Sequence, residues 1–341
     1  MKVSVVILNW NGREMLRRFL PSVVKYSKME GVEICVADNA SDDDSCAVLE
    51  REFPDIRLIR LDQNYGFAEG YNRALQQVDA TYVVLLNSDV EVTEGWLSIL
   101  TDYMDKHLHV AACQPKILSQ QNKSYFEYAG AAGGFIDRYG YPFCRGRIFD
   151  CLEVDNGQYD EVIPIFWASG AAFMIRLDIY RKEGGLDSRF FAHMEEIDLC
   201  WRIRSRGYEI HCVPGSVVYH VGGGTLKKEN PHKTFLNFRN NLLMLYKNLP
   251  DRELTKVMRV RWYLDNLAVI VFLLKGDWKN MYAIIKARKE YHRMKHLFTT
   301  DRDDNLHYTM VGRIPERWNC CILWQAKWKR KCYFSMFKRK S

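Results

Sequence analysis

The sequence predicts an α/β protein built on a doubly wound, mostly parallel sheet with helices on both faces. Three observations support this prediction. Short apolar strands alternate with amphipathic helices from residue 3 onward, polar clusters rich in Asn and Asp follow the strands, and 48% of the 341 residues are hydrophobic, enough for a large core. Strands that alternate with helices form parallel sheets with right-handed crossovers, so we expect the strands to share one carboxyl edge.

The first part of the chain shows this alternation most clearly. Strand patterns lie at Val3 to Leu8, Val32 to Ala37, Ile56 to Leu61 and Val83 to Leu86, and helix patterns at Glu14 to Tyr26, Cys46 to Phe53 and Tyr71 to Val78. Between the third strand and the third helix, Asn64 to Gly70 is expected to form a glycine-bearing loop. Glycines in such a loop let the backbone approach a ligand closely.

Two acids end strands of this predicted sheet. Asp89 follows the apolar run Val83 to Leu86, and Asp38 follows Val32 to Ala37. Ligands of open α/β sheets bind beyond the carboxyl ends of the strands, so both carboxylates are expected at one site. Asp89 suits Mg²⁺ or Mn²⁺ shared with substrate phosphates, and Asp38 suits hydrogen bonds from a base or ribose. The alternatives are a polar strand-end turn at Asp89 and a helix cap at Asp38.

The middle of the chain is less regular. The pattern predicts a helix at Glu94 to Met104, a strand at Val110 to Cys113, loops and short strands after Lys116, an apolar element at Phe166 to Ile175, a loop and helix around Glu195, strands ending at Pro214 and His220, and a helix at Phe235 to Tyr246. An isolated His is usually structural. His220, however, ends an apolar strand before the glycines 222–224, and neutral imidazole is a reasonable ligand for Mn²⁺.

The C-terminal part is basic. Residues 251–341 hold 21 Lys and Arg against 9 Asp and Glu, a net charge of +12, whereas residues 1–250 have a net charge of −5. The apolar run Leu267 to Leu274 is too short to span a bilayer, which needs about 20 residues. It is expected either to lie in a membrane interface or to pack as a core helix. Trp318, Trp324, Trp328 and the closing Lys and Arg favour a role near anionic lipid.

The motifs up to about residue 245 resemble those of the inverting glycosyltransferases of family 2, which have the GT-A fold. The resemblance rests on six ordered segments: Val3 to Gly12, Ala37 to Asp42, Asn64 to Asn72, Leu85 to Asp89, Phe166 to Ile175 and Phe190 to Arg202. The family's metal motif is usually Asp-x-Asp. This chain has Asn87-Ser88-Asp89, as in members that look like rhamnosyltransferases, so the resemblance implies that Asp89 is the main metal carboxylate.

The resemblance implies a role for each residue of the expected site. The metal, Mg²⁺ or Mn²⁺, is expected on Asp89 and His220. The acceptor side is expected to contain Trp167, Ser169 and Gly170, although Trp167 fits a buried strand equally well. The nucleotide-sugar is expected to contact Asn9, Asp38, Asn64, Gly66, Asn72, Asn87 and Ser88.

The expected catalytic base lies at the start of the helix around residue 195. Inverting transfer needs a base that takes the proton of the acceptor hydroxyl. The family usually has Glu-Asp-x-Asp here, and this chain has Glu195-Glu196-Ile197-Asp198. Matched position by position, the base is Glu196, with Asp198 and Glu195 as rivals. Acids at a helix start are also common as partners of the helix dipole.

We therefore expect an inverting, metal-dependent glycosyltransferase, with a catalytic domain at residues 1–248 and a helical basic extension at 249–341. Its donor would be dTDP-rhamnose or a UDP-sugar, and its acceptor a saccharide or lipid-linked molecule in cell-surface polysaccharide synthesis. One alternative is a sugar-phosphate nucleotidyltransferase, which should show a Gly-rich, basic loop after the first strand. Another is a non-enzymatic membrane- or nucleic-acid-binding module that uses the basic tail. No nucleic acid is expected as a partner of the enzyme.

Cysteine usage and the first residues indicate the compartment. The ten cysteines are scattered without a CxxC pair, which is typical of core thiols in a reducing environment. The chain begins directly with a strand pattern, so no secretion signal is expected. We expect a cytoplasmic protein, with peripheral attachment to the inner face of the cytoplasmic membrane as the role of the basic extension.

Overall fold

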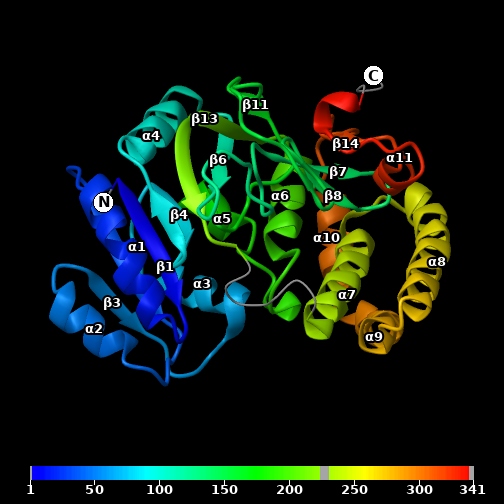
Figure 1. Cartoon of the computed structure of the whole chain (residues 1–341), viewed down its shortest axis with the longest axis horizontal. Helices are drawn as coiled ribbons and strands as arrows, with labels where there is room; N and C mark the ends of the chain where they lie inside the picture. The colour runs from blue at the N-terminus through cyan, green and yellow to red at the C-terminus, as the bar shows by residue number, and fades with distance from the viewer. Residues whose placement is uncertain (1, 223–229, 338–341) are drawn as a thin grey trace.

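The computed structural model describes residues 2–222 and 230–337, which form two sheets surrounded by helices (Figure 1). The strands of the central sheet are β1 (Val3–Asn9), β2 (Val32–Asp38), β3 (Arg57–Arg60), β4 (Tyr82–Asn87), β5 (Val90–Val92), β6 (Val110–Ser119), β11 (Ile163–Pro164), β12 (Ala172–Arg176) and β13 (Glu209–His220). Those of the second sheet are β7 (Gly134–Asp137), β8 (Pro142–Cys144), β9 (Arg147–Ile148), β10 (Cys151–Leu152) and β14 (Arg317–Trp318).

The central sheet follows the order β11-β13-β6-β12-β4-β1-β2-β3, and β5 pairs with the end of β13. Strands β3, β2, β1 and β4 run parallel, as do β6 and β13. Strand β12 lies antiparallel between β4 and β6. The prediction of an α/β fold with a mostly parallel sheet is confirmed. The carboxyl ends of β1, β2 and β4 lie at one edge, as the sequence indicated.

The α-helices of the described chain are α1 (Arg13–Tyr26), α2 (Ser45–Glu52), α3 (Gly66–Gln76), α4 (Trp96–Lys106), α5 (Leu177–Lys182), α6 (Glu195–Ser205), α7 (Pro231–Asn248), α8 (Asp251–Leu274), α9 (Trp278–Met294), α10 (Thr299–His307) and α11 (Ile322–Lys327). Short 3₁₀ helices lie at Ser188–Phe190, Lys295–Phe298 and Phe334–Met336. In Figure 1, α7 to α11 gather on the side of the molecule away from β1.

Side chains of the central strands enter two cores, because successive residues of a strand point to opposite faces. Val84 and Leu86 of β4 lie in the core that α1 and α4 cover. Val83 and Leu85 of the same strand lie in the core beneath α3, α5, α6 and α7. Burial on both faces explains why β4 is a continuous apolar run rather than an alternating one.

Two elements differ from the sequence-based expectation. Helix α3 begins at Gly66, not at Tyr71, because the backbone carbonyl of Phe191 accepts hydrogen bonds from the first amides of the helix, those of Phe67 and Ala68. Strand β13 does not stop at Pro214 but continues to His220. An irregular register between Val213 and Val217 accommodates the proline, which has no amide hydrogen to donate.

The C-terminal extension completes the second sheet. Strand β14 of the extension pairs in parallel with β7, and Trp318 packs against Phe135 and Phe143. Trp318 is buried, so the expectation that it lies near lipid is wrong, whereas Trp324 and Trp328 are exposed. The expected domain boundary at residue 248 falls between α7 and α8. The second sheet, however, contains strands from both sides of this boundary, because β14 pairs with β7. All ten cysteines are free thiols.

The apolar run Leu267 to Leu274 ends α8 on the surface. Leu267, Ile270 and Leu274 are all exposed, so its interpretation as a buried core helix is wrong. Across residues 2–222 and 230–337, no helix is both long enough and apolar enough to cross a membrane.

Candidate active site

Asp38 ends β2 inside a network of hydrogen bonds. It accepts them from Asn9 Nδ2 (2.9 Å), the Ser41 amide (2.9 Å) and Ser41 Oγ (2.6 Å). Residues Asn9 and Asp38 are direct partners in the β1–β2 register, so strand pairing brings them together. The Oδ1 atom of Asn9 is buried and has no hydrogen-bond partner among the described residues. A Cβ at Gly12 would come within 2.4 Å of that oxygen, so the turn after β1 needs glycine.

Asn39, which the sequence analysis did not single out, holds the neighbouring loop. Its buried side chain donates to Asn64 Oδ1 (3.1 Å) and to the Gly66 carbonyl (3.0 Å), and accepts from the Tyr65 amide (3.0 Å). Gly66 has a φ of +74°, and the Phe191 ring lies 2.6 Å from where a Cβ would be. Asn64 and Gly66 thus lie beside Asp38, as predicted, and Gly66 also contacts the loop that precedes α6.

Three further residues of the predicted donor site lie in different surroundings. Asn87 ends β4, and its Nδ2 lies 3.5 Å from His220 Nε2. Ser88 Oγ lies 3.7 Å from the Cβ position of Gly12. Asn72 instead faces away from this edge: it binds the Leu186 amide and carbonyl (3.0 and 2.7 Å) and the Tyr180 hydroxyl (2.6 Å). Asn72 therefore holds the turn after α5, and the structure corrects the prediction that Asn72 contacts the donor.

Strand pairing also places Asp89 beside His220. In the antiparallel β5–β13 pair, His220 lies opposite Val90, and the Val221 amide donates to the Asp89 carbonyl (3.1 Å). His220 Nε2 is 3.1 Å from Asp89 Oδ1, and Nδ1 is 3.2 Å from Glu127 Oε2. Burial lowers the pKa of His220, but the two carboxylates raise it more, to about 10. Burial raises the pKa of Asp89, but the effect of His220 is larger and opposite. The net pKa of this carboxyl is therefore lowered, which favours its ionised form.

The pair Asp89 and His220 fits a divalent cation. Octahedral Mg²⁺ has ligands at about 2.0–2.1 Å, so neighbouring ligands lie about 3 Å apart, close to the 3.1 Å seen here. Glu127 faces the other ring nitrogen, where metal-binding histidines usually have a carboxylate or carbonyl partner. Within the described residues no group of three or more His, Cys, Asp or Glu side chains is arranged to hold a metal. Substrate phosphates and water would have to complete the coordination.

Glu195 and Glu196 begin α6 with unpaired carboxyl oxygens. The Oε2 atom of each is buried and has no hydrogen-bond partner among the described residues. Burial, and then the charge of Glu196, raise the pKa of Glu195 well above its usual range, which favours the protonated form of this carboxyl. Burial raises the pKa of Glu196 to about 7. Glu196 is only partly buried, which leaves it within reach of a ligand.

Asp198, the third acid of this helix start, is fully buried and fully engaged. It accepts hydrogen bonds from Arg202 Nε (3.0 Å), Lys247 Nζ (2.9 Å) and Asn248 Nδ2 (2.7 Å). These bonds tie α6 to α7. A carboxylate held by two cations in the core serves the fold, so the geometry sets Asp198 apart from the other two acids.

The loop before Glu195 has a strained backbone that α7 holds in place. Phe191, His193 and Met194 have φ values of 66°, 71° and 76°, in the region that favours glycine. Asn240 Nδ2 donates to the carbonyls of residues 190, 192 and 193 at 2.8–2.9 Å. Such strain is typical of functional sites and persists only where the surroundings enforce it. Asn240 was missed because nothing in the helix pattern distinguishes it from a solvated polar residue.

The predicted acceptor residues are mostly buried. Trp167 donates through Nε1 to the Phe135 carbonyl (2.9 Å), and its ring covers Gly134. This ring belongs to the core and offers no open face. The structure therefore corrects the prediction that a sugar stacks on Trp167. Ser169 is also buried, where its amide donates to Gln114 (3.0 Å). Gly170 contacts the Phe67 ring at the start of α3, which places this segment near the donor loop.

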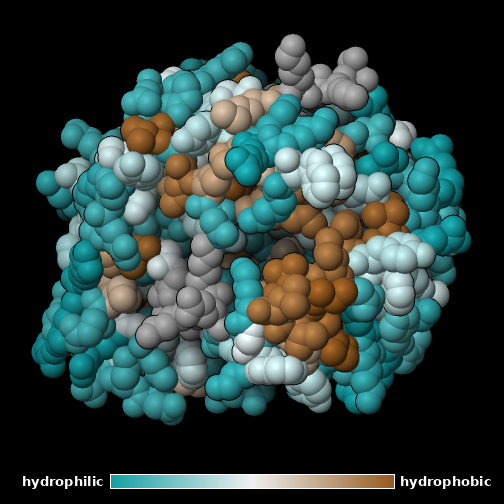
Figure 2. Space-filling model, turned by 45° about the vertical axis from the view of Figure 1, so that its right-hand side comes forward, coloured by the Kyte–Doolittle hydropathy of each residue, from teal (hydrophilic) through white to brown (hydrophobic). Residues whose placement is uncertain are grey.

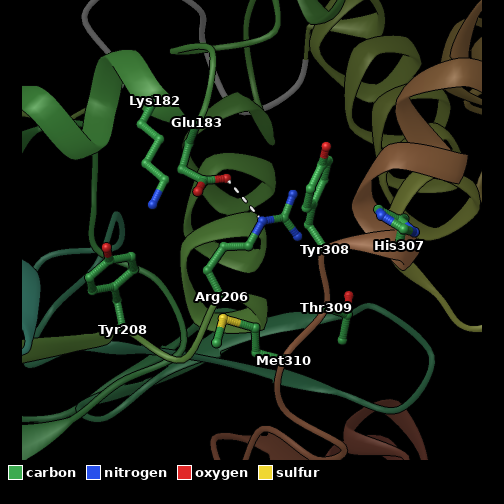
Figure 3. A pocket seen from close by; sticks show the side chains of 8 residues that line it. All are labelled: Lys182, Glu183, Arg206, Tyr208, His307, Tyr308, Thr309 and Met310. Atoms are coloured by element: carbon green, nitrogen blue, oxygen red, sulfur yellow. Dashed lines mark ion pairs between the residues drawn. The ribbon is translucent and has the colours of Figure 1, made fainter.

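Two neighbouring cavities lie at the opposite edge of the sheet. The first, of about 560 Å³, opens where β13 begins, and Figure 3 shows Glu183 paired with Arg206 among its lining residues. The second, of about 500 Å³, lies beside Asn72 and Lys247. Neither is lined by Asp38, Asp89, Glu196 or His220, so neither belongs to the candidate site. The glycines 223 and 224, predicted to follow His220, lie outside the described residues.

Comparisons with known proteins address the family and the fold. Residues 4–158 match the model of the glycosyl transferase family 2. The N-acetylglucosaminyl-diphospho-decaprenol L-rhamnosyltransferase of Mycobacterium tuberculosis is 25% identical over 232 residues, which cover 64% of this chain and 75% of that protein.

Solved structures show the same fold. The structure of GalNAc-T7 with UDP, GalNAc and Mn²⁺ superposes with a TM-score of 0.57 at 16% identity, over 90% of this chain and 58% of that one. A mannosyltransferase from Pyrobaculum calidifontis, in complex with GDP-Man and Mn²⁺, superposes with a TM-score of 0.52 at 12% identity, over 90% of this chain and 85% of that one. Together these matches support the resemblance drawn from the sequence motifs: residues 4–158 match glycosyl transferase family 2, and the chain is a glycosyltransferase with a GT-A-like fold.

Proposed function

We propose that this enzyme transfers a sugar, with inversion, from a nucleotide-sugar donor to a saccharide or lipid-linked acceptor in cell-surface polysaccharide synthesis. The observation that supports the proposal most directly is Glu196, a partly buried acid with an unpaired oxygen and a pKa raised to about 7 by burial. A general base works best when its pKa lies near the working pH. Its loop packs on the start of α3, beside the predicted donor residues Asn64 and Gly66.

In this proposal Glu196 is the catalytic base. Its carboxylate accepts the proton of the acceptor hydroxyl as that oxygen bonds to the anomeric carbon. The bond from this carbon to the diphosphate oxygen breaks, and its electron pair leaves with the nucleoside diphosphate. Attack from the face opposite the leaving group inverts the carbon. Glu195 is buried and its raised pKa favours the protonated form, and Asp198 is held by Lys247 and Arg202, so neither suits the role of base as well as Glu196.

On the donor side, Asn9 and Asp38 would contact the nucleoside, and Asp89 and His220 would hold Mg²⁺ or Mn²⁺. The ion would neutralise the charge that develops on the departing diphosphate. Metal dependence is supported by the 3.1 Å spacing of Asp89 and His220 and by the Mn²⁺ present in the GalNAc-T7 and Pyrobaculum calidifontis mannosyltransferase structures, which have this fold. Binding the ion requires His220 to release the proton that Asp89 and Glu127 favour, so metal binding should release protons.

The proposed donor and acceptor are based on the mycobacterial relative. Because the mycobacterial protein is a rhamnosyltransferase of a diphospho-decaprenol substrate, we propose dTDP-rhamnose or a UDP-sugar as donor and a lipid-linked saccharide as acceptor. Such an acceptor would place the enzyme on the inner face of the cytoplasmic membrane. The nucleotidyltransferase alternative lacks support, since the turn Asn9 to Arg13 has no Gly-rich basic loop. A purely non-enzymatic module does not agree with the family match.

The test is a screen of nucleotide sugars for hydrolysis and transfer, followed by two matched variants. Glu196→Gln keeps the size of the side chain but removes the base, so transfer should fall by roughly 10² to 10⁴ while donor affinity barely changes. Glu195→Gln resembles the protonated acid already present and should keep near wild-type transfer. Transfer that survives in Glu196→Gln but is lost in Glu195→Gln would contradict the assignment. NMR of the first product reports whether the anomeric configuration inverts.

A further inference from the structure

Helix α8 has two faces of different character. Val257, Arg261 and Asp265, spaced four residues apart, point inward and are buried. Arg261 donates to the Tyr139 carbonyl (2.9 Å) and pairs with Asp265 (3.2 Å), which also pairs with Arg288 of α9 (2.5 Å). These contacts fix the orientation of the helix. Its opposite face is therefore held outward, since residues two positions apart on a helix point about 200° from one another.

That outward face is apolar. Tyr263, Leu267, Ile270 and Leu274 follow one another at helical spacing and are 63%, 52%, 50% and 81% exposed. The first turns of α9 continue the pattern with exposed side chains at Trp278, Tyr282 and Ile285. We call these seven residues the α8–α9 apolar face. Figure 2, which turns the side bearing α8 toward the viewer, shows hydrophobic surface gathered there in one large patch. A contiguous apolar patch on the surface often marks an interaction site.

Cations predominate around this face. Residues 256–289 contain six exposed Lys or Arg, at positions 256, 259, 275, 279, 286 and 289, and none has an ion pair within the described structure. The stretch has two acids. Asp265 is buried, and Asp277 accepts hydrogen bonds from the Asn280 amide and side chain at the start of α9. The face is thus apolar at its centre, with aromatic side chains and unpaired cations around it.

We propose that the α8–α9 apolar face docks on an anionic lipid bilayer surface, where it lies in the interface without crossing the membrane. Apolar side chains enter the boundary between headgroups and acyl chains, Trp and Tyr suit the headgroup level, and Lys and Arg pair with anionic lipids. A second copy of the chain fits less well, because a two-fold contact through this face would bring the same cations of both copies together. The biological need for docking rests on the proposed lipid-linked acceptor.

The test uses full-length protein and vesicles, and it needs no substrate. Wild-type protein is expected to co-sediment with vesicles that contain phosphatidylglycerol and much less with pure phosphatidylcholine vesicles, and high salt should weaken the binding. The double variant Leu267→Glu/Ile270→Glu should lower vesicle binding at least tenfold. Its matched control is Leu108→Glu, since Leu108 is also exposed but lies between α4 and β6. The control should bind vesicles as the wild type does.

Several outcomes would overturn the proposal. Wild-type protein that ignores anionic vesicles, or a double variant that binds them as the wild type does, would do so. A mass in solution that shows a dimer in the wild type and a monomer in Leu267→Glu/Ile270→Glu would assign the face to a second copy instead. Nucleotide-sugar hydrolysis in the absence of vesicles should be equal in all variants. A failure of the proposed enzymatic function would therefore appear in that assay, separately from the vesicle result.

Discussion

Replacing Glu196 by Gln is expected to stabilise the fold at high pH while it removes activity. Burial raises the pKa of this carboxyl from 4.5 to about 7, so the folded protein holds a proton that the unfolded chain releases between these values. The stability from the protonated form is complete below about pH 4.5 and is lost as the pH rises to about 7. Each pKa unit corresponds to about 1.4 kcal/mol, so the loss is at most about 3.5 kcal/mol, and Gln avoids it.

The effect of Glu196→Gln on stability can be checked by thermal unfolding of the wild type and the variant at about pH 8.5 and about pH 4.5. The variant should unfold a few degrees higher than the wild type at pH 8.5 and at the same temperature at pH 4.5. The matched change Asp198→Asn should act in the opposite direction, because it leaves the buried Arg202 without its carboxylate and removes one of the two carboxylates that pair with Lys247, the other being Asp187; breaking a buried ion pair costs about 3–5 kcal/mol. A Glu196→Gln protein that unfolds at a lower temperature than the wild type at pH 8.5 would refute the reasoning.

Three further predictions concern positioning and folding. Glu127→Gln should weaken Mn²⁺ binding about 10- to 100-fold in calorimetric titration, because it removes the carboxylate facing His220; unchanged affinity would argue against that role. Asn240→Ala removes three hydrogen bonds to the loop before α6 and should lower kcat more than donor affinity; a wild-type kcat would show that the loop keeps its shape without them. Truncation after Pro250 removes β14 and the buried Arg261, so the fragment should be unfolded by circular dichroism; a folded, donor-binding fragment would contradict this.

The first four strands and the ends of β2 and β4 could be predicted because their signals are local. An apolar run followed by Asp38 or Asp89 needs no knowledge of distant residues, and parallel pairing then brings the carboxyl ends to one edge. The turn chemistry of Asn9 to Gly12 is equally local. These features supplied the expected donor side of the site.

Other features depend on contacts between distant residues, which periodicity does not reveal. Helix α3 starts at Gly66 only because the Phe191 carbonyl caps it. His220 meets Asp89 because β5 pairs with the end of β13, and a three-residue strand such as β5 gives almost no pattern. Glu127 comes from the irregular segment after Lys116, where no pattern distinguishes one acid from another.

The predicted acceptor side was weakest because aromatic and small residues suit both cores and binding sites. Trp167 in an apolar run fits a sugar platform and a buried strand equally well, and only its bond to the Phe135 carbonyl decides between them. Trp318 shows the same ambiguity, since it lies in an aromatic core rather than near lipid. Composition alone did not separate such residues from the exposed Trp324 and Trp328.

The central claim is a metal-assisted nucleotide-sugar site at Asp89, and titration of UDP and dTDP with and without Mn²⁺ tests it most directly. Wild-type protein should bind one of these diphosphates more tightly with Mn²⁺. The variant Asp89→Asn should lose that enhancement, and Asp102→Asn, at an exposed acid on α4, should keep it. If the wild type shows no enhancement, or Asp89→Asn keeps all of it, the account of this site is contradicted.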